Sequence, residues 1–327
     1  MFFHNKFKPS LQYIATNFLG VNMLQTDWTQ KQIVILAFDH RGSFMKKLFG
    51  ISGRQPTPEE SKEVSDYKMV VYEGFKQALQ NGVPKEVAGI LIDEQFGTGI
   101  AHDAKKNGIR FAMPAEKSGQ NEFDFEYGMD YKKHIEQFDP TFCKVLVRLN
   151  PDDDKDTTTN QLLRLKELGE YLKSTNKPYL FELLVPASED QLKQFDGEVS
   201  KYDLELRPKL MVQSMSIILE AGVEPDLWKL EGVDREEDAK AIVAQAQSNG
   251  RKAGVITLGR GANAEKVSEW LKVGAKISGV VGFAIGRTIF WNALEGLKNR
   301  KHDRKAAIDM ISRNYKEFVD LWVESRI

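Results

Sequence analysis

Lys229 is the residue whose type and setting most clearly predict chemistry in this chain. It lies in the segment Pro225-Asp-Leu-Trp-Lys-Leu-Glu-Gly232, inside a short apolar run that is typical of a buried strand. Because burial of an ammonium group costs free energy, a buried lysine tends to have a lowered pKa. The neutral amine is a nucleophile that can form a Schiff base with a carbonyl substrate. The alternative is a structural lysine at a strand end whose amine reaches water.

Charged side chains also occur in, or directly after, other apolar runs. By strand alternation Lys144 shares a face with Arg148, while Glu182 shares one with apolar neighbours. If these faces turn toward one interior, Lys144 helps to lower the pKa of Lys229 by charge repulsion, and Glu182 balances Lys144 or moves protons. The alternative is an inert cluster of buried ion pairs. The third run leads into Glu116-Lys117-Ser118-Gly119, to which we assign no role. The candidates at the run ends are Asp39, Asp93, Lys144, Arg148, Glu182 and Lys229.

Two turns rich in glycine and arginine predict a phosphate site. Each follows one of the last two apolar runs and precedes a stretch that is compatible with a helix. Free backbone N–H groups, helix N-termini and an arginine fork suit a phosphate, and barrel enzymes often bind phosphate after strands seven and eight. The alternative is a pair of ordinary turns with surface arginines. The residues assigned to this site are Gly259, Arg260, Gly261, Gly286 and Arg287.

The elements that must position these residues are eight short apolar runs separated by amphipathic stretches. Near-continuous apolar strands are typical of a parallel sheet that is covered on both faces. The runs are 33–38, 87–92, 109–113, 144–147, 179–185, 227–230, 254–258 and 279–284. Helical patterns occur at 60–81, 134–138, 159–174, 234–249, 263–273 and 305–323, several of them with capping signals at their ends.

Eight strands that alternate with helices predict a single (β/α)8 barrel, which typically needs about 250 residues. We expect residues 31–327 to form it and residues 1–30 to be an N-terminal extension. In a barrel, polar residues at the C-terminal strand ends converge on one site. A doubly wound open sheet is the alternative, but the turn Asp39-His-Arg-Gly-Ser43 lacks the GxGxxG pattern that usually marks one.

Composition argues against several other classes of protein. The chain has 46 basic and 47 acidic residues, so no charge excess points to nucleic acid or to an anionic membrane. No apolar stretch approaches the roughly 20 residues of a membrane span. Residues 1–22 make a poor secretory signal, so we expect a cytoplasmic protein and leave homo-oligomerisation open. The single cysteine, Cys143, and five scattered histidines offer no metal cluster, so we expect neither metal nor cofactor.

Five segments carry a resemblance to a known family. In chain order they are Leu36-Ala-Phe-Asp-His-Arg-Gly-Ser43, Ile90-Leu-Ile-Asp-Glu94, Asn150-Pro-Asp-Asp153, Pro225-Asp-Leu-Trp-Lys-Leu-Glu231 and Gly282-Phe-Ala-Ile-Gly-Arg-Thr-Ile-Phe290. They resemble the 2-deoxy-5-keto-gluconate 6-phosphate aldolase-type domain of inositol catabolism, and their order is similar to that in bacterial class I tagatose-1,6-bisphosphate aldolases. The likeness runs from about Ile33 to Arg326, although the turn after the seventh run, Leu-Gly-Arg-Gly, differs from other members.

The resemblance implies a (β/α)8 class I aldolase that needs no metal, with Lys229 at the position of the Schiff-base lysine. The acid–base and substrate-binding positions of the related aldolases correspond to Asp39, Lys144 and Glu182. The phosphate-binding end corresponds to Gly259, Gly261, Gly286 and Arg287.

We therefore expect a lyase that cleaves a phosphorylated keto sugar or keto acid through an imine at Lys229. The resemblance suggests 2-deoxy-5-keto-gluconate 6-phosphate as the substrate, with dihydroxyacetone phosphate and malonate semialdehyde as products. Glu182 and Asp39 are candidates for moving the hydroxyl proton, and Lys144 for holding a substrate oxygen. The alternatives are a tagatose- or fructose-bisphosphate aldolase, a metal-dependent aldolase, and a catalytically silent phosphosugar-binding or regulatory barrel.

Overall fold

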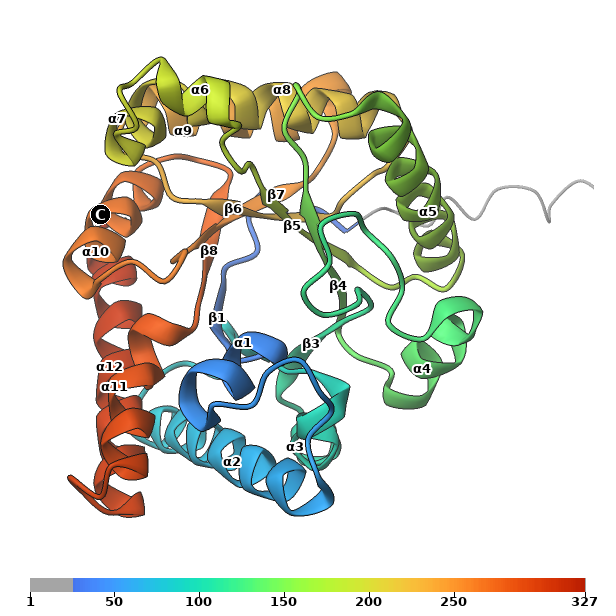
Figure 1. Ribbon diagram of the computed structural model, residues 1–327. Coiled ribbons are helices and arrows are strands. Elements are labelled where there is room, and N and C mark those ends of the chain that lie inside the picture. Colours follow the sequence, from blue (N-terminus) through green and yellow to red (C-terminus); the bar gives the residue numbers. More distant parts are fainter. Residues whose placement is uncertain (1–25, 327) are drawn as a thin grey trace, which may run out of the picture.

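Eight parallel strands close into a barrel, in the order of the sequence, in the computed structural model, which describes residues 26–326. Each strand pairs with the next along the chain, and β8 pairs with β1 to close the ring. Figure 1 shows the strands at the centre with the helices around them. The strands are β1 (Ile33–Ala37), β2 (Ala88–Leu91), β3 (Arg110–Pro114), β4 (Phe142–Arg148), β5 (Tyr179–Leu184), β6 (Leu227–Glu231), β7 (Gly254–Leu258) and β8 (Val280–Ile285).

Helices fill the connections between the strands and form the outer layer (Figure 1). The link from β5 to β6 contains three of them, whereas the links from β2 to β3 and from β7 to β8 contain one each. The helices are α1 (Gly42–Phe44), α2 (Pro58–Gln80), α3 (Glu94–Lys106), α4 (Tyr131–Phe138), α5 (Lys155–Ser174), α6 (Glu189–Lys193), α7 (Val199–Glu205), α8 (Arg207–Glu220), α9 (Glu236–Ala246), α10 (Ala264–Ala275), α11 (Arg287–Lys298) and α12 (Arg304–Glu324). The short turns are η2 (Met45–Phe49), η3 (Gly128–Asp130) and η4 (Ser248–Gly250).

The (β/α)8 barrel expected from the sequence is confirmed, and the open-sheet alternative is wrong. All eight apolar runs form strands, and the helical patterns correspond to α2, α4, α5, α9, α10 and α12. The patterns did not reveal α3 or α8. Two glycines, Gly97 and Gly99, weaken the helical signal of α3. Apolar residues lie around much of the circumference of α8, so no single stripe marks it.

Apolar side chains fill the N-terminal part of the barrel interior. The inward residues form a continuous buried cluster that includes Ile35, Phe142 and Leu180. Trp28 closes this end: its backbone N–H donates to the carbonyl of Lys252 at 3.0 Å, and its ring lies 5.2 Å from that of Phe142. Residues 1–25 of the expected N-terminal extension lie outside the described residues.

Strand alternation puts three charged side chains directly above this apolar layer. The first inward residues of β4, β5 and β6 belong to the layer. Lys144, Glu182 and Lys229 each follow one of them by two residues, so they point inward on the same faces. The register of β5 and β6 sets Glu182 beside Lys229. The expected convergence of these side chains thus follows from the register of neighbouring strands.

Closure of the barrel depends on a glycine at the junction of β8 and β1. The register pairs Gly282 with Ile33. A Cβ atom on Gly282 would lie 1.6 Å from the carbonyl oxygen of Ile33, which is far inside van der Waals contact. Any side chain at this position therefore has to push the two strands apart.

The substitution Gly282→Ala is expected to lower the free energy of unfolding by about 3 kcal/mol, because overpacking at a strand junction distorts the backbone. Urea unfolding measures the change. Gly99→Ala in α3 is the matched control, since a Cβ there meets nothing within 4 Å. That variant should be neutral, or more stable by up to about 1 kcal/mol. Equal stability of the two variants would contradict the role assigned to Gly282.

Candidate active site

A cavity of about 490 Å³ opens at the C-terminal end of the barrel. Every strand except β2 contributes to its lining, either directly or through the loop that follows the strand. Its volume lies within the range of small-molecule sites, about 300–1,000 Å³. It gathers almost all residues that the sequence analysis singled out: Asp39, Lys144, Arg148, Glu182, Lys229, Gly259, Arg260, Gly261, Gly286 and Arg287.

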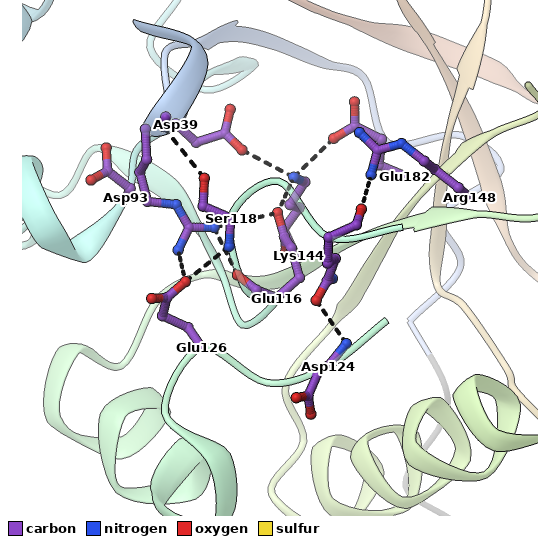
Figure 2. A network of polar contacts seen from close by, with 12 residues as sticks. Asp39, Asp93, Glu116, Ser118, Asp124, Glu126, Lys144, Arg148 and Glu182 are labelled. Carbon is purple, nitrogen blue, oxygen red and sulfur yellow. Dashed lines mark hydrogen bonds and ion pairs between the residues drawn. The ribbon is translucent and has the colours of Figure 1, made fainter. Parts of the chain in front are cut away.

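Lys144 lies at the centre of the charged group in this cavity. Its ammonium is 2.6 Å from Glu116 Oε1, 2.9 Å from Glu182 Oε2 and 3.0 Å from Asp39 Oδ2. Figure 2 shows the three carboxylates around the lysine nitrogen. Burial alone would lower the pKa of Lys144, but the three negative charges outweigh burial and hold this pKa above its ordinary value. Lys144 is therefore a fixed cation.

Lys229 is joined to this group through Glu182. Its Nζ lies 2.8 Å from Glu182 Oε2, the same oxygen that contacts Lys144. The Lys229 side chain is only 6% exposed and lines the cavity. The sequence predicts direct charge repulsion between the two lysines. Instead one carboxylate oxygen is shared between them, so each ammonium has a counter-charge.

The three carboxyl groups around Lys144 differ in their electrostatics. Burial raises the pKa of each, but the charges of Lys144 and Lys229 hold the pKa values of Asp39 and Glu182 below their usual range. For Glu116 burial dominates over the charges of Lys144 and Arg41, so its pKa is raised. Glu116 is thus the carboxyl of this group that most readily carries a proton.

The loop after β3 brings Glu116 to the cavity, and Arg41 holds this loop. Arg41 Nη2 donates to the carbonyl oxygen of Glu116 at 2.7 Å, and its Nη1 donates to Glu126 at 2.7 Å. Glu126 also accepts a hydrogen bond from the backbone N–H of Ser118 at 2.9 Å (Figure 2). Both the Arg41 and Glu116 side chains are only 7% exposed, so this loop is fixed by a buried polar network.

The glycine- and arginine-rich turns after β7 and β8 meet at one side of the cavity. The helix α11 begins at Arg287 without a side-chain cap, and the N-cap residue Gly286 lines the cavity. The Arg287 guanidinium lies against Gly261, where a Cβ would come within 2.5 Å of Nη2 and φ is +73°. Within residues 26–326, no carboxylate lies within ion-pair distance of Arg287. The guanidinium donates one hydrogen bond, from Nη2 to the carbonyl oxygen of Arg260 at 3.5 Å. An uncapped helix N-terminus beside a guanidinium that has no carboxylate partner in this part of the chain suits an anion.

Arg260 lies in the same turn, but its charge is already neutralised. Its Nη1 lies 2.5 Å from Asp203 Oδ2 and its Nε lies 2.9 Å from Glu231 Oε1. Its backbone adopts a left-handed conformation, with φ of 49°. These contacts fasten the β7 turn to α7 and β6, so the Arg260 side chain is better placed to hold the turn than to bind phosphate.

Arg148, at the end of β4, lines the cavity on the side of β3 and β4. Its Nη1 donates to the carbonyl oxygen of Gln120 at 2.5 Å, a contact drawn in Figure 2. Among the described residues it has no carboxylate partner within ion-pair distance. A second arginine with unused donors therefore lies across the barrel from Arg287.

Asp93 is the candidate that the structure keeps out of the cavity, so its assignment to substrate binding is corrected. It is fully buried, accepts a hydrogen bond from the backbone N–H of Phe96 at 2.9 Å as the N-cap of α3, and forms an ion pair with Lys68 of α2. Lys68 also donates to the carbonyl of Phe38 at 2.9 Å. A strand-end carboxylate that caps the next helix turns away from the barrel axis.

Two residues of the site were not assigned a role from the sequence. Glu116 lies two residues after the end of β3, beyond the reach of strand alternation. His40 follows Asp39 and lines the cavity, and its Nδ1 is buried without a hydrogen-bond partner in the described part of the chain. Burial, together with the charges of Arg287 and Lys229, lowers the pKa of His40 to about 4 despite the charge of Asp39. The imidazole is therefore neutral at pH 7.

Two other classes of site are absent from residues 26–326. No cluster of three or more histidine, cysteine, aspartate or glutamate side chains is arranged to hold a metal ion. No helix in this part of the chain is long and apolar enough to cross a membrane.

Because His40 is neutral in the folded protein, acid should destabilise the fold through it. The unfolded chain binds a proton at this histidine below about pH 6.5, whereas the folded chain does so only near its pKa of about 4. The contribution of His40 to stability is thus present above pH 6.5 and is lost as the pH falls toward 4. His40→Gln should reduce the acid-induced loss of stability between these values by on the order of 1–3 kcal/mol.

Urea unfolding at a series of pH values measures this effect, with His102→Gln on the exposed side of α3 as the control. If the free energy of unfolding of His40→Gln depends on pH as that of the wild type does, the imidazole has the same pKa in the folded and unfolded chains, which would contradict the prediction.

Comparisons with known proteins agree with this fold. A fructose-bisphosphate aldolase from Plasmodium falciparum has a similar structure. The likeness covers 90% of this chain and 91% of that chain, with a TM-score of 0.64 and 12% identity. The protein Cgl0159 from Corynebacterium glutamicum (Brevibacterium flavum) matches over 88% of this chain and 86% of its own, with a TM-score of 0.53 and 17% identity. At such identities the likeness concerns the fold alone. No curated protein matches in sequence. Residues 21–326 match the family described as "Uncharacterized protein conserved in bacteria (DUF2090)", and the chain belongs to that family.

Proposed function

We propose that this aldolase-like barrel is a class I aldolase that cleaves a phosphorylated keto sugar or keto acid through an imine at Lys229. The observation that carries the proposal is the contact of Lys229 Nζ with Glu182 Oε2, at 2.8 Å, inside a cavity of small-molecule size. An amine beside a carboxylate that can take its proton is the arrangement that imine formation needs. The fold likeness to a fructose-bisphosphate aldolase supports the same class of reaction.

Imine formation begins with transfer of a proton from Lys229 to Glu182. The neutral amine attacks the substrate ketone, and Glu182 returns the proton to the oxygen that leaves as water. The resulting iminium ion accepts the electron pair of the bond between the α and β carbons when this bond breaks. The hydroxyl group on the β carbon loses its proton in the same step, which gives an enamine and an aldehyde. The enamine takes up a proton, and hydrolysis of the imine then releases the ketone product and regenerates the lysine.

The anion site beside Arg287 supports a substrate that carries a phosphate group near its ketone. The N-terminus of α11 and the unpaired guanidinium would hold this phosphate, while the ketone reaches Lys229. The substrate chain would then extend across the barrel toward Arg148, which could bind a second anionic group. Substrates that fit are 2-deoxy-5-keto-gluconate 6-phosphate, suggested by the sequence resemblance, and a ketose bisphosphate such as fructose or tagatose 1,6-bisphosphate.

Lys144 would polarise a substrate oxygen rather than act as a nucleophile. Three carboxylates keep it charged, and they fix its position to within hydrogen-bond distance of each. Asp39 Oδ2 lies 3.0 Å from Lys144 Nζ, and the charges of Lys144 and Lys229 hold the pKa of Asp39 well below its usual range. In this proposal Asp39 therefore anchors Lys144, and the proton of the substrate hydroxyl needs another acceptor.

Lys229→Met should abolish covalent trapping. Sodium borohydride added with dihydroxyacetone phosphate should reduce the imine and leave a stable adduct on Lys229, which peptide mass spectrometry would locate. The variant should form no adduct and should lose at least about 10³-fold in the cleavage rate of the substrates named above. Lys201→Met, an exposed lysine on α7 paired with Glu198, is the control. Turnover by Lys229→Met at the wild-type rate would refute the mechanism, and tight binding without turnover in the wild type would favour a silent binding protein.

Arg287→Met should weaken binding of phosphorylated ligands. A hydrogen-bonded charge pair contributes about 1.5–3 kcal/mol, so KM or Kd should rise about 10- to 150-fold. Calorimetry with dihydroxyacetone phosphate, alongside unphosphorylated dihydroxyacetone, measures the loss. Arg251→Met is the control, because Arg251 pairs with Glu224 away from the cavity. An equal Kd in wild type and Arg287→Met would exclude this arginine from the phosphate site.

A further inference from the structure

Glu116 is a third carboxyl on Lys144 for which the mechanism above has no use. Its Oε1 lies 2.6 Å from Lys144 Nζ, and the residue lines the cavity. Its other oxygen, Oε2, is buried and has no hydrogen-bond partner within the described chain. A buried polar atom without a partner costs about 1–3 kcal/mol. Because Glu116 lines the cavity, its incompletely paired carboxyl group is typical of one that awaits a ligand.

The order of the strands tells which part of a substrate would meet Glu116. In a closed eight-stranded barrel, β3 and β4 lie opposite β7 and β8. A substrate with its phosphate at the β7–β8 side and its ketone at Lys229 must direct its remaining carbons toward β3 and β4. The hydroxyl group two carbons from the imine carbon then approaches Lys144 and Glu116, whose contact is drawn in Figure 2.

Glu182 and Glu116 both contact Lys144, but their other charged neighbours differ. Glu182 contacts both lysines and is next to the nitrogen of the imine. For Glu116 the ion pairs within the described residues are those with Lys144 and, at 4.0 Å, with Arg41; it has none with Lys229. Burial raises the pKa of Glu116 while that of Glu182 is lowered. The two groups therefore suit two different proton transfers.

The loop that carries Glu116 is held in place by hydrogen bonds that do not involve Glu116 Oε2. Arg41 binds the backbone carbonyl of Glu116 and the carboxylate of Glu126, which in turn accepts from the N–H of Ser118. These contacts fix the β3 loop on both sides of the residue. The carboxyl group of Glu116 is thus held at the cavity before a substrate binds, and the loop need not order first.

On the basis of the proposed function, we propose that Glu116 is the acid–base residue of the carbon–carbon bond step. In cleavage, the carboxylate of Glu116 takes the proton of the substrate hydroxyl while the C–C electron pair moves into the iminium ion. This forms the aldehyde C=O, the enamine and a protonated Glu116. In condensation, the enamine attacks the aldehyde and Glu116 returns the same proton to the new alkoxide. Lys144 stabilises the charge on that oxygen in both directions.

The decisive variant is Glu116→Gln, which keeps the shape of the side chain but cannot transfer a proton. Three reactions would be measured with dihydroxyacetone phosphate as the ketone. They are borohydride trapping at Lys229, deuterium exchange of the carbon acid in the absence of aldehyde, and condensation with malonate semialdehyde or glyceraldehyde 3-phosphate. Trapping and exchange should stay within about threefold of wild type, whereas condensation should fall about 10²- to 10⁴-fold. Glu116→Asp, which keeps a carboxyl group, should recover part of this loss.

Glu122→Gln is the matched control, because Glu122 lies on the same loop, pairs with Arg164 and is outside the cavity. Condensation at the wild-type rate in Glu116→Gln would overturn the inference. Loss of trapping in a variant that melts like wild type would also overturn it, since Glu116 would then serve the imine. If wild type itself forms no adduct, the proposed function fails, and that outcome is separate from any effect of Glu116.

Discussion

The candidate site depends on the ion pairing of one buried ammonium group. Lys144 is about 1% exposed, and a charge in such a place must be compensated. Its three carboxylate partners come from the ends of β1 and β5 and from the loop after β3. Removing one partner of a buried pair typically costs about 3–5 kcal/mol. The pairing therefore ties three separate segments together across the mouth of the barrel and sets the shape of the cavity.

The surroundings of Lys144 explain why the pKa values of its three carboxyl partners shift in different directions. Asp39 and Glu182 feel the field of a second lysine, Lys229, which keeps both of them ionised. Glu116 has the charges of Lys144 and Arg41 beside it, but they do not outweigh burial, so its pKa is raised. Groups within a few ångströms of one cation thus acquire different proton affinities through their next neighbours. The barrel supplies this difference because each group comes from a different strand end.

Much of the fold and the centre of the site could be predicted from local patterns, since strand periodicity fixes both the barrel elements and the inward faces. The errors and gaps arose where a residue lies outside a strand or pairs with a distant segment. Asp93 follows β2, but its partner Lys68 comes from α2, and no local pattern reveals that pair. Arg260 is neutralised in part by Asp203, from the long connection between β5 and β6. Glu116 stands beyond β3, where a loop sets the direction of its side chain.

In the proposed aldolase, the charged groups that would bind the ends of the substrate are different from those that would react with it. At the centre of the cavity Lys144 and Lys229 already have carboxylate partners, whereas Arg287 and Arg148 at the two sides keep donors for a ligand. A substrate that is anionic at both ends can dock on the arginines without breaking the central pairs. Its reacting carbons then lie near Glu182, which would exchange a proton with Lys229 across 2.8 Å, and near Glu116. Because little reorganisation of charge would be required, this arrangement would suit the bond-breaking step of the proposed aldolase.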